Sequence, residues 1–212
     1  MVILSGLKEL NLFSKSDTCV IFGGSFNPPH VAHTVIFSYA LDIFNADFYI
    51  LPTKTPPHKS VDVPFDKRFE WTVKVFSDFN KFENVFIWDL EKNIEGVNYA
   101  IKNVEQFSRY YENIILLVGE DALGNIEKWY EYEKLLEISY FAIYPRTRDG
   151  SLYERGKKVL GKYYSKVIEL KNFPLLELSS SEIRQRIVQG KSVYGMVSEK
   201  IIEDVIKTYS EH

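Results

Sequence analysis

Short apolar runs of strand length alternate with amphipathic stretches of helix length along most of the chain. The apolar runs predict strands at 18–22, 48–51, 85–88, 114–118, 141–144 and 167–170. The amphipathic stretches predict helices at 31–44, 65–79, 99–110, 181–189 and 198–209. This alternation predicts an α/β fold, with a doubly wound, Rossmann-like parallel sheet and helices on both faces.

Two segments add detail to this prediction. The unbroken apolar run 114–118 suits a strand covered on both faces. In the stretch 65–79, Phe65, Phe69, Val73 and Phe76 recur at helical spacing and predict one buried face. Ligands of such sheets bind at the carboxyl ends of the strands, near the switch in strand order, so we expect the site there.

The organisation is expected to be simple. The chain has no repeat of fixed period, no low-complexity tract and no long linker. Residues 1–16 stand outside the pattern and are expected to form a short extra helix or a loose arm. Residues 17–212 are predicted to form a single domain, whose closing helices complete the site.

Composition narrows the class of protein. The 212 residues carry a formal net charge of −3, which argues against a nucleic-acid partner. A single cysteine excludes an intrachain disulfide and a cysteine-based zinc site. No apolar run reaches the ~20 residues that cross a bilayer, and the first residues do not resemble a signal peptide. We therefore expect no membrane association and a cytoplasmic enzyme or binding protein.

Glycines and histidines cluster directly after the first predicted strand. Gly23 and Gly24 allow a sharp turn and a close approach to a ligand. The next helix offers free N–H groups and a positive dipole end, which attract phosphate. His30 and His33 are three residues apart and share a helix face, and a histidine that titrates near neutrality adds charge. The spacing is not that of a P-loop, and no metal site made of protein ligands is predicted.

Two further segments could supply phosphate ligands. Lys54, His58 and Lys59 place donors in a proline-rich loop after the second strand. Ser179 and Glu182 have the spacing of a helix capping box, whereas Arg184 opposes the dipole of that helix, a conflict that a bound phosphate resolves. No covalent nucleophile is evident, so the set suits phosphoryl or nucleotidyl transfer by positioning and charge stabilisation.

The segment Gly-Gly-Ser-Phe-Asn-Pro-Pro-His-Val-Ala-His at 23–33 resembles the His-x-Gly-His signature of a nucleotidyltransferase superfamily, with Ala32 in place of glycine. The bacterial nicotinate-nucleotide adenylyltransferase family is the most similar, from about residue 18 to the end. Arg68 matches an arginine of that family, whereas Asn98 and Ala100 depart from its Ser-Tyr-Thr. The other similar segments are Pro-Pro-His-Lys at 56–59, Gly-Glu-Asp at 119–121, Trp-Tyr at 129–130 and Ser-Ser-Ser-Glu-Ile-Arg at 179–184.

The resemblance implies a reaction and a set of site residues. The reaction is adenylyl transfer from ATP to nicotinate mononucleotide, giving nicotinate adenine dinucleotide and pyrophosphate in NAD biosynthesis, with Mg²⁺ accompanying ATP. The implied catalytic residues are His30, His33 and Arg184. The implied ATP ligands are Gly23, Gly24, Ser25, Phe26, His33, Asp121, Ser180, Ser181 and Arg184, with Lys54, His58 and Lys59 as a triphosphate loop. The implied mononucleotide ligands are Asn27, Tyr99, Ala100, Trp129 and Tyr130.

Several alternatives stay open at this point. The enzyme could prefer nicotinamide mononucleotide or accept both mononucleotides. More distant readings are a pantetheine-phosphate or cytidylyl transferase and an inactive nucleotide-sensing module. The sequence does not decide the oligomeric state, and a homo-oligomer is left open.

Overall fold

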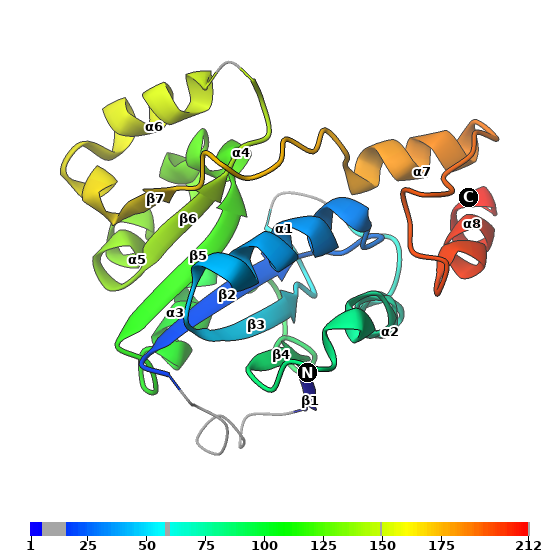
Figure 1. Cartoon of the computed structure of the whole chain (residues 1–212), viewed down its shortest axis with the longest axis horizontal. Helices are drawn as coiled ribbons and strands as arrows, with labels where there is room; N and C mark the ends of the chain where they lie inside the picture. The colour runs from blue at the N-terminus through cyan, green and yellow to red at the C-terminus, as the bar shows by residue number, and fades with distance from the viewer. Residues whose placement is uncertain (6–15, 58–59, 149, 212) are drawn as a thin grey trace.

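The computed structural model describes residues 1–5, 16–57, 60–148 and 150–211, and these form an α/β sandwich (Figure 1). The strands are β1 (Val2–Leu4), β2 (Thr18–Gly24), β3 (Asp47–Pro52), β4 (Val85–Trp88), β5 (Asn113–Gly119), β6 (Tyr140–Tyr144) and β7 (Val167–Glu169). The helices are α1 (Val31–Ile43), α2 (Phe65–Phe76), α3 (Ala100–Phe107), α4 (Glu120–Leu123), α5 (Tyr132–Ile138), α6 (Ser151–Leu160), α7 (Ser180–Val188) and α8 (Ile202–Ser210). Short 3₁₀ turns are η2 (Ser77–Phe79), η3 (Ile126–Lys128) and η4 (Gly161–Lys166).

The seven described strands make one sheet in the order β1-β4-β3-β2-β5-β6-β7, and every neighbouring pair is parallel. This confirms the predicted doubly wound parallel sheet. The chain adds strands to one side of β2 and then returns to add β5 on the other side. The switch in strand order therefore lies between β2 and β5, where open α/β sheets bind their ligands.

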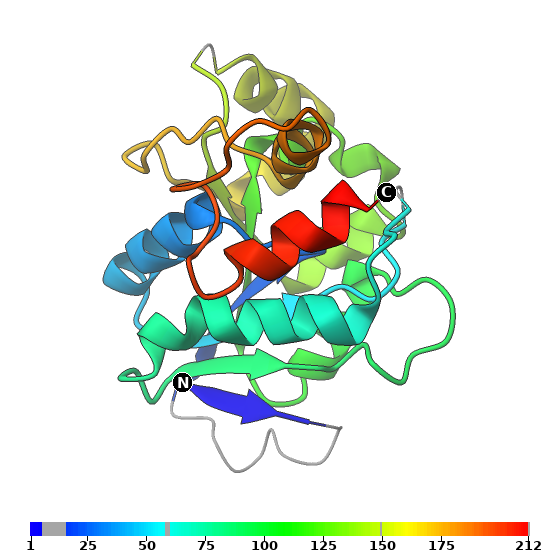
Figure 2. The ribbon, with the colours of Figure 1, turned by 90° about the vertical axis from the view of Figure 1, so that its right-hand side faces the viewer.

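Each central strand sends alternate side chains to two hydrophobic clusters. In β2, Val20 and Phe22 face the cluster that holds α1, α2, α7 and α8, whereas Cys19 and Ile21 face the cluster under α3, α4, α5 and α6. Figures 1 and 2 show these two helical layers on opposite faces of the sheet. Because side chains alternate across a strand, the apolar runs become strands that are buried on both sides.

The first residues differ from the prediction. Residues 2–4 form β1, which pairs with β4 at the edge of the sheet and lies beside it in Figure 2, rather than an extra helix or a loose arm. The terminal amine of Met1 donates to the carbonyls of Asn80 (2.9 Å) and Phe82 (2.5 Å), which fixes the start of the strand. Residues 6–15 lie outside the described part, so the domain boundary at residue 16 stays a prediction.

The buried face of α2 is only partly the predicted one, since Phe76 is the one predicted residue of the four that is buried. Its buried residues are Arg68, Trp71, Thr72, Val75 and Phe76, whereas Phe65, Phe69 and Val73 are only partly covered. The helix is rotated because α8 packs against it: Trp71 Nε1 donates to Asp204 at 2.7 Å. Figure 2 shows α8 lying beside α2.

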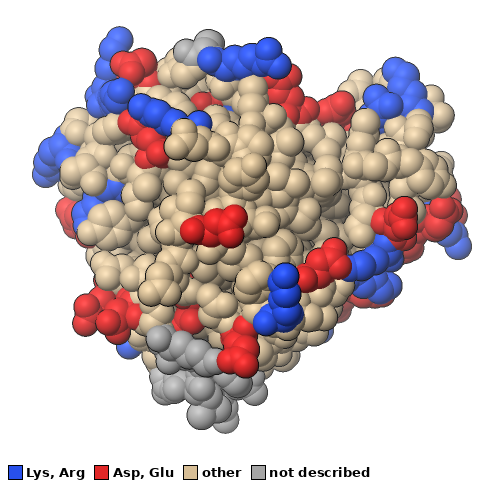
Figure 3. Space-filling model, in the orientation of Figure 1, with Lys and Arg blue, Asp and Glu red and all other residues tan. Residues whose placement is uncertain are grey.

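No helix in the described ranges is long and apolar enough to cross a membrane. Charged side chains of both signs are scattered over the face that Figure 3 shows, with no single-sign stripe on it. That face therefore shows no basic surface for a nucleic-acid backbone.

Candidate active site

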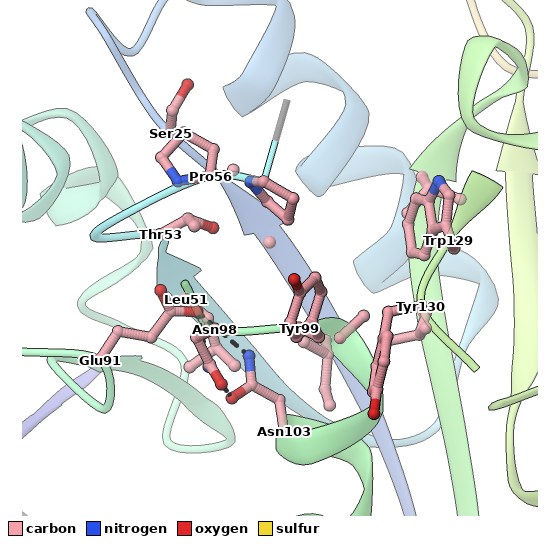
Figure 4. Close-up of a pocket in the computed structure, with 17 residues that line it drawn as sticks. Ser25, Leu51, Thr53, Pro56, Glu91, Asn98, Tyr99, Asn103, Trp129 and Tyr130 are labelled. Carbon is pink, nitrogen blue, oxygen red and sulfur yellow. Dashed lines mark hydrogen bonds between the residues drawn. The ribbon is translucent and has the colours of Figure 1, made fainter. Parts of the chain in front are cut away.

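Two adjoining cavities open at the carboxyl ends of β2 and β5. The polar cavity, of about 410 Å³, is lined by His30, His33, Asp121, Arg146, Ser180, Ser181 and Arg184, among others. The aromatic cavity, of about 280 Å³, is lined by Tyr99, Trp129 and Tyr130 and by Glu91, Asn98 and Asn103 (Figure 4). The two cavities share part of their lining, namely Gly23, Gly24, Ser25, Val118 and Trp129. A ligand with a polyanionic part and a flat part can therefore span both.

The turn after β2 forms the wall between the cavities. Phe26 is buried and has a φ of 44°, a left-handed conformation that is uncommon for a residue other than glycine. Its ring lies over Gly24, where an added Cβ would come within 3.3 Å of it. Asn27 follows and is also buried, and Tyr209 of α8 donates to its Oδ1 at 2.5 Å. The last helix thus fixes the turn that carries the glycines.

His30 and His33 form a stacked pair at the start of α1. Their ring centroids are 3.7 Å apart, and the backbone N–H of His30 donates to Nδ1 of His33 at 3.1 Å. Because Nδ1 of His33 accepts this hydrogen bond, the proton of the neutral ring is on Nε2. The Nε2 N–H is thus the donor group of the His33 ring, and His33 lines the polar cavity.

His30 is a neutral group at physiological pH. Burial lowers its pKa to about 3, and the charge of Arg146 adds to the effect. Its side chain is 1% exposed, yet it reaches the lining of the polar cavity. The charge that we expect from a histidine titrating near neutrality is thus absent at His30, whose ring packs against that of His33.

Helix α7 brings the predicted hydroxyls and guanidinium to the same cavity. Ser179 caps the helix by accepting from the backbone N–H of Glu182 at 3.1 Å. Ser180 Oγ donates to the carbonyl of Pro28 at 2.8 Å, and Arg184 donates to the carbonyl of Asn27 at 2.7 Å. The histidine pair and Arg184, separate in the sequence, thus line one cavity.

Arg146 is a cation of the polar cavity that the sequence analysis missed. It lies just after β6, and its Nε is 3.6 Å from Oδ1 of Asp121. Ligands of parallel sheets bind at the carboxyl ends of the strands, and this rule placed Asp121 in the site. The same rule could have placed Arg146 there, because Arg146 follows the carboxyl end of the neighbouring parallel strand β6.

The aromatic cavity has rings on one side and a polar floor on the other (Figure 4). Tyr99 and Tyr130 stack with centroids 4.6 Å apart, and Trp129 lies near them. On the floor, Glu91 accepts hydrogen bonds from Asn98 (3.1 Å) and Asn103 (3.2 Å). The backbone N–H of Lys54 also donates to Glu91, at 2.8 Å. Burial of Glu91 raises its pKa, against the opposing effect of these hydrogen bonds.

This floor was not predicted. Its residues come from the segment after β4 and from α3, and their meeting is set by the tertiary fold. Asn98 is one of the two residues that differ from the family's Ser-Tyr-Thr segment, so the resemblance assigned it no role. Ala100, the other departure, lines the aromatic cavity at the first turn of α3.

The proline-rich loop does not supply Lys54 to either cavity. Its ammonium group donates instead to the carbonyls of Lys92 (2.8 Å) and Ile94 (2.9 Å), which hold the segment after β4. We therefore correct the prediction that Lys54 is a triphosphate ligand. His58 and Lys59 lie outside the described residues, so their predicted role is not tested.

Arg68 is buried rather than a surface cation. Its guanidinium donates to the carbonyls of Val63, Ser25, Thr53 and Lys54, at distances of 2.6–3.0 Å. These acceptors belong to the turn after β2 and to the loop on either side of residues 58–59. Arg68 thus joins the segments that border both cavities, and four carbonyls offset the cost of burying its charge.

The described residues contain no group of three or more His, Cys, Asp or Glu side chains that could hold a metal ion. Asp121, the carboxylate that lines the polar cavity among the described residues, is paired with Arg146. A cation that enters with a polyanionic ligand would therefore be held by that ligand's oxygens and by water.

Comparisons with known proteins agree with this geometry. Residues 21–186 match the cytidylyltransferase-like family. The chain is 70% identical over 202 residues to a probable nicotinate-nucleotide adenylyltransferase of Fervidobacterium nodosum, covering 94% of each chain. It is 40% identical over 205 residues to a protein of the same description from Thermotoga maritima, covering 96% of this chain and 97% of that protein.

Solved structures show the same fold. Plasmodium falciparum nicotinic acid mononucleotide adenylyltransferase, complexed with NaAD, superposes with a TM-score of 0.75 at 19% identity. The match covers 92% of this chain and 98% of that one. The same parasite protein complexed with APC gives a TM-score of 0.70 at 18% identity, with the same coverage. At this identity the likeness establishes the architecture alone.

Proposed function

Because the chain belongs to the cytidylyltransferase-like family and, within it, to the nicotinate-nucleotide adenylyltransferases, we propose that it transfers the adenylyl group of ATP to nicotinate mononucleotide. The products are nicotinate adenine dinucleotide, a precursor of NAD, and pyrophosphate. Such an enzyme of NAD biosynthesis works in the cytoplasm.

The observation that carries this proposal is the shared wall of the two cavities. The polar cavity offers imidazole, hydroxyl and guanidinium donors, which suit the phosphates of ATP. The aromatic cavity offers Trp129 and Tyr99, which suit a pyridine ring. Since Gly23, Gly24 and Ser25 border both, the two substrates meet at this turn with their phosphates adjacent.

The chemistry is one in-line displacement at the α-phosphorus of ATP. An oxygen of the mononucleotide 5′-phosphate forms the new O–P bond, the bond to the β-phosphate bridging oxygen breaks, and pyrophosphate leaves. The attacking phosphate is already ionised, so no strong general base is needed. Positioning and charge stabilisation supply the acceleration.

The residues of the polar cavity have different roles in binding and stabilising the phosphates. His33, protonated on Nε2, donates to the α-phosphate as negative charge builds there. His30 is neutral; it holds the orientation of His33 and offers a hydrogen bond to the phosphates. Arg184, Ser180 and Ser181 hold the triphosphate from the opposite side.

Mg²⁺ is the proposed companion of ATP. It would be coordinated by phosphate oxygens and water and would neutralise charge on the leaving pyrophosphate. The donor set fits this arrangement, because the cavity supplies neutral and cationic hydrogen-bond donors around the phosphates, and its described carboxylate, Asp121, is paired with Arg146.

A second candidate substrate is nicotinamide mononucleotide. Glu91 is the one charged side chain among the described residues of the aromatic cavity, and Oδ1 of Asn98 has no hydrogen-bond donor there. Both are acceptors, and a carboxamide can donate to an acceptor whereas a carboxylate cannot. The observation favours dual specificity over strict selection of the acid.

The test is pyrophosphate release with each mononucleotide, with ATP and Mg²⁺ present. Release with the acid supports the proposed function, and release with both at comparable kcat/KM supports dual specificity. Binding of ATP by calorimetry without any pyrophosphate release would overturn the enzymatic proposal and favour the inactive nucleotide-sensing module.

A further inference from the structure

Three consecutive residues at the end of β5 converge on Arg146, the unpredicted cation of the polar cavity. They are Gly119, Glu120 and Asp121, where the chain passes from β5 into α4. Arg146 stands two residues beyond β6, the strand that pairs with β5. The two segments are therefore neighbours at the carboxyl edge of the sheet, and each of the three residues contacts Arg146 in a different way.

Glu120 holds the backbone of Arg146. Its side chain is fully buried, and its Oε1 accepts hydrogen bonds from the backbone N–H groups of Arg146, at 2.9 Å, and of Thr147. A buried carboxyl group is costly unless donors surround it, so its presence here indicates a specific task. Glu120 lines neither the polar nor the aromatic cavity, and therefore it acts through the turn that it anchors.

Gly119 and Asp121 set the side chain of Arg146. A Cβ at position 119 would clash with Oδ1 of Asp121 and would lie 3.1 Å from Cδ and 3.2 Å from Nε of Arg146, so both members of the ion pair pack over the glycine. Asp121 pairs with Nε at 3.6 Å. The ion pair uses Nε, and a guanidinium has further donors on its two Nη atoms.

The place of Arg146 fits an anionic ligand. Its side chain is 29% exposed and lines the polar cavity together with His33 and Arg184. It also borders a small cavity beside His30 and His33, and its charge contributes to the lowered pKa of His30. It is thus a second guanidinium in the cavity, beside that of Arg184.

We propose that Arg146 binds the phosphates of ATP and that Glu120 is the positioning residue that holds the turn after β6 so that this guanidinium faces the polar cavity. The inference rests on the proposed function, because it takes ATP as the ligand. Glu120 makes the arginine's backbone rigid, Gly119 leaves room for its side chain, and Asp121 fixes its Nε edge.

The first experiment compares single variants by steady-state kinetics and by calorimetric ATP affinity. Arg146→Met should raise the KM and the Kd for ATP about tenfold or more, as expected for a lost charged hydrogen bond, and leave the KM for nicotinate mononucleotide within about twofold. Arg148→Met is the matched control, since that arginine is highly exposed and lines neither cavity. An unchanged ATP affinity in Arg146→Met would overturn the proposal.

The second experiment tests positioning by Glu120. Glu120→Gln keeps an Oε1 acceptor and should stay near wild type, whereas Glu120→Ala releases the turn and should raise the KM for ATP. In the Arg146→Met background the same alanine substitution should add little, because the two residues act as one unit. An equal effect of Glu120→Ala in both backgrounds would overturn the positioning role, as would a loss of thermal stability with unchanged KM for ATP.

Gly119→Ala keeps the proposal testable if Glu120→Ala does not fold. Its Cβ would displace both Asp121 and Arg146 while Glu120 stays in place, so ATP affinity should fall, and an unchanged affinity would count against the placement of Arg146. Failure of the proposed function is a separate result: the wild type would release no pyrophosphate. The calorimetric affinities of the same variants would still decide the role of Arg146.

Discussion

The backbone N–H of His30 donates to Nδ1 of His33, and the two imidazole rings stack 3.7 Å apart. This contact assigns different tasks to two residues of the same type. His33 has its ring proton on Nε2, whereas His30 is buried and neutral and its ring stacks on that of His33. The pair is therefore not a pair of equivalent cations, because His30 stays neutral.

His33→Ala should lose the donor that acts in the transition state. We expect kcat to fall by ~10²–10³, with a modest change in the KM for ATP, because such an interaction contributes to kcat rather than to ground-state binding. Steady-state kinetics with ATP and nicotinate mononucleotide measure this. Thr34→Ala is the control, since Thr34 is the next residue, lines neither cavity, and its hydroxyl donates to the carbonyl of Val31 at 2.9 Å. A turnover of His33→Ala near that of the control would refute the assignment.

The lowered pKa of His30 predicts a pH-dependent stability. The unfolded chain protonates this ring below about pH 6.5, whereas the folded protein does so only below about pH 3. Between these values the unfolded state binds more protons, so the free energy of unfolding falls as the pH is lowered from 6.5 towards 3. At pH 5 the contribution is about 2 kcal/mol.

Denaturant unfolding at pH 7 and pH 5 tests this contribution. His30→Asn keeps a good helix N-cap and removes the titrating ring. The loss of stability between the two pH values should be smaller in the variant by about 2 kcal/mol, because the carboxylates titrate in both proteins. Equal losses in the two proteins would show that His30 titrates normally.

Arg184 and Arg186 offer a matched comparison on one helix. Arg184→Ala removes a guanidinium from the polar cavity and should lower kcat/KM for ATP at least about tenfold. Arg186 is on the exposed side of α7, where its Nε donates to the carbonyl of Ser192 at 3.0 Å, and Arg186→Ala should keep kcat/KM within about twofold. Equal effects of the two substitutions would argue for a structural role of α7 alone.

Trp129 should act mainly on the mononucleotide. Trp129→Ala removes a ring from the aromatic cavity and should raise the KM for nicotinate mononucleotide about 10- to 100-fold, the usual effect of losing a base–aromatic stack. Trp129→Phe keeps a smaller ring and should give an intermediate KM. Since Trp129 also borders the polar cavity, the KM for ATP is measured in parallel, and an effect confined to ATP would contradict the stacking role.

The strands were predictable because their signal is local. Val85–Trp88 forms a strand with the predicted limits, and the run in β5 is extended by one residue at each end, since continuous burial leaves an unbroken apolar run. Residues 2–4 were missed because three residues carry no periodicity. The buried face of α2 was partly misplaced because a periodicity of apolar residues leaves Arg68 out, whereas four carbonyls brought together by the fold satisfy this arginine inside.

The residues of the candidate site also separate into those with a local sequence signal and those placed by the tertiary fold. His30, His33, Ser180 and Arg184 were found because each stands in a motif close to a predicted strand or helix end. Glu91 and Arg146 were not, because their roles depend on which distant segment lies opposite. Lys54 shows the converse error: it stands near the site in the sequence, but its ammonium group is bound by carbonyls of a different loop.

Ala32 replaces the glycine of the His-x-Gly-His signature, and the structure predicts that this costs no activity. Its methyl group lines the small cavity with Tyr144 and Leu176 and does not line the polar cavity. Ala32→Gly should therefore leave kcat and the KM for ATP within about twofold of wild type. It should lower stability by about 1 kcal/mol, because glycine is a poor helix former and a buried methyl group is lost, which shifts Tm by roughly 2–4 °C. Kinetics and a thermal melt of the same preparation measure both, and a large change in turnover with unchanged Tm would show that the methyl group contacts the substrate.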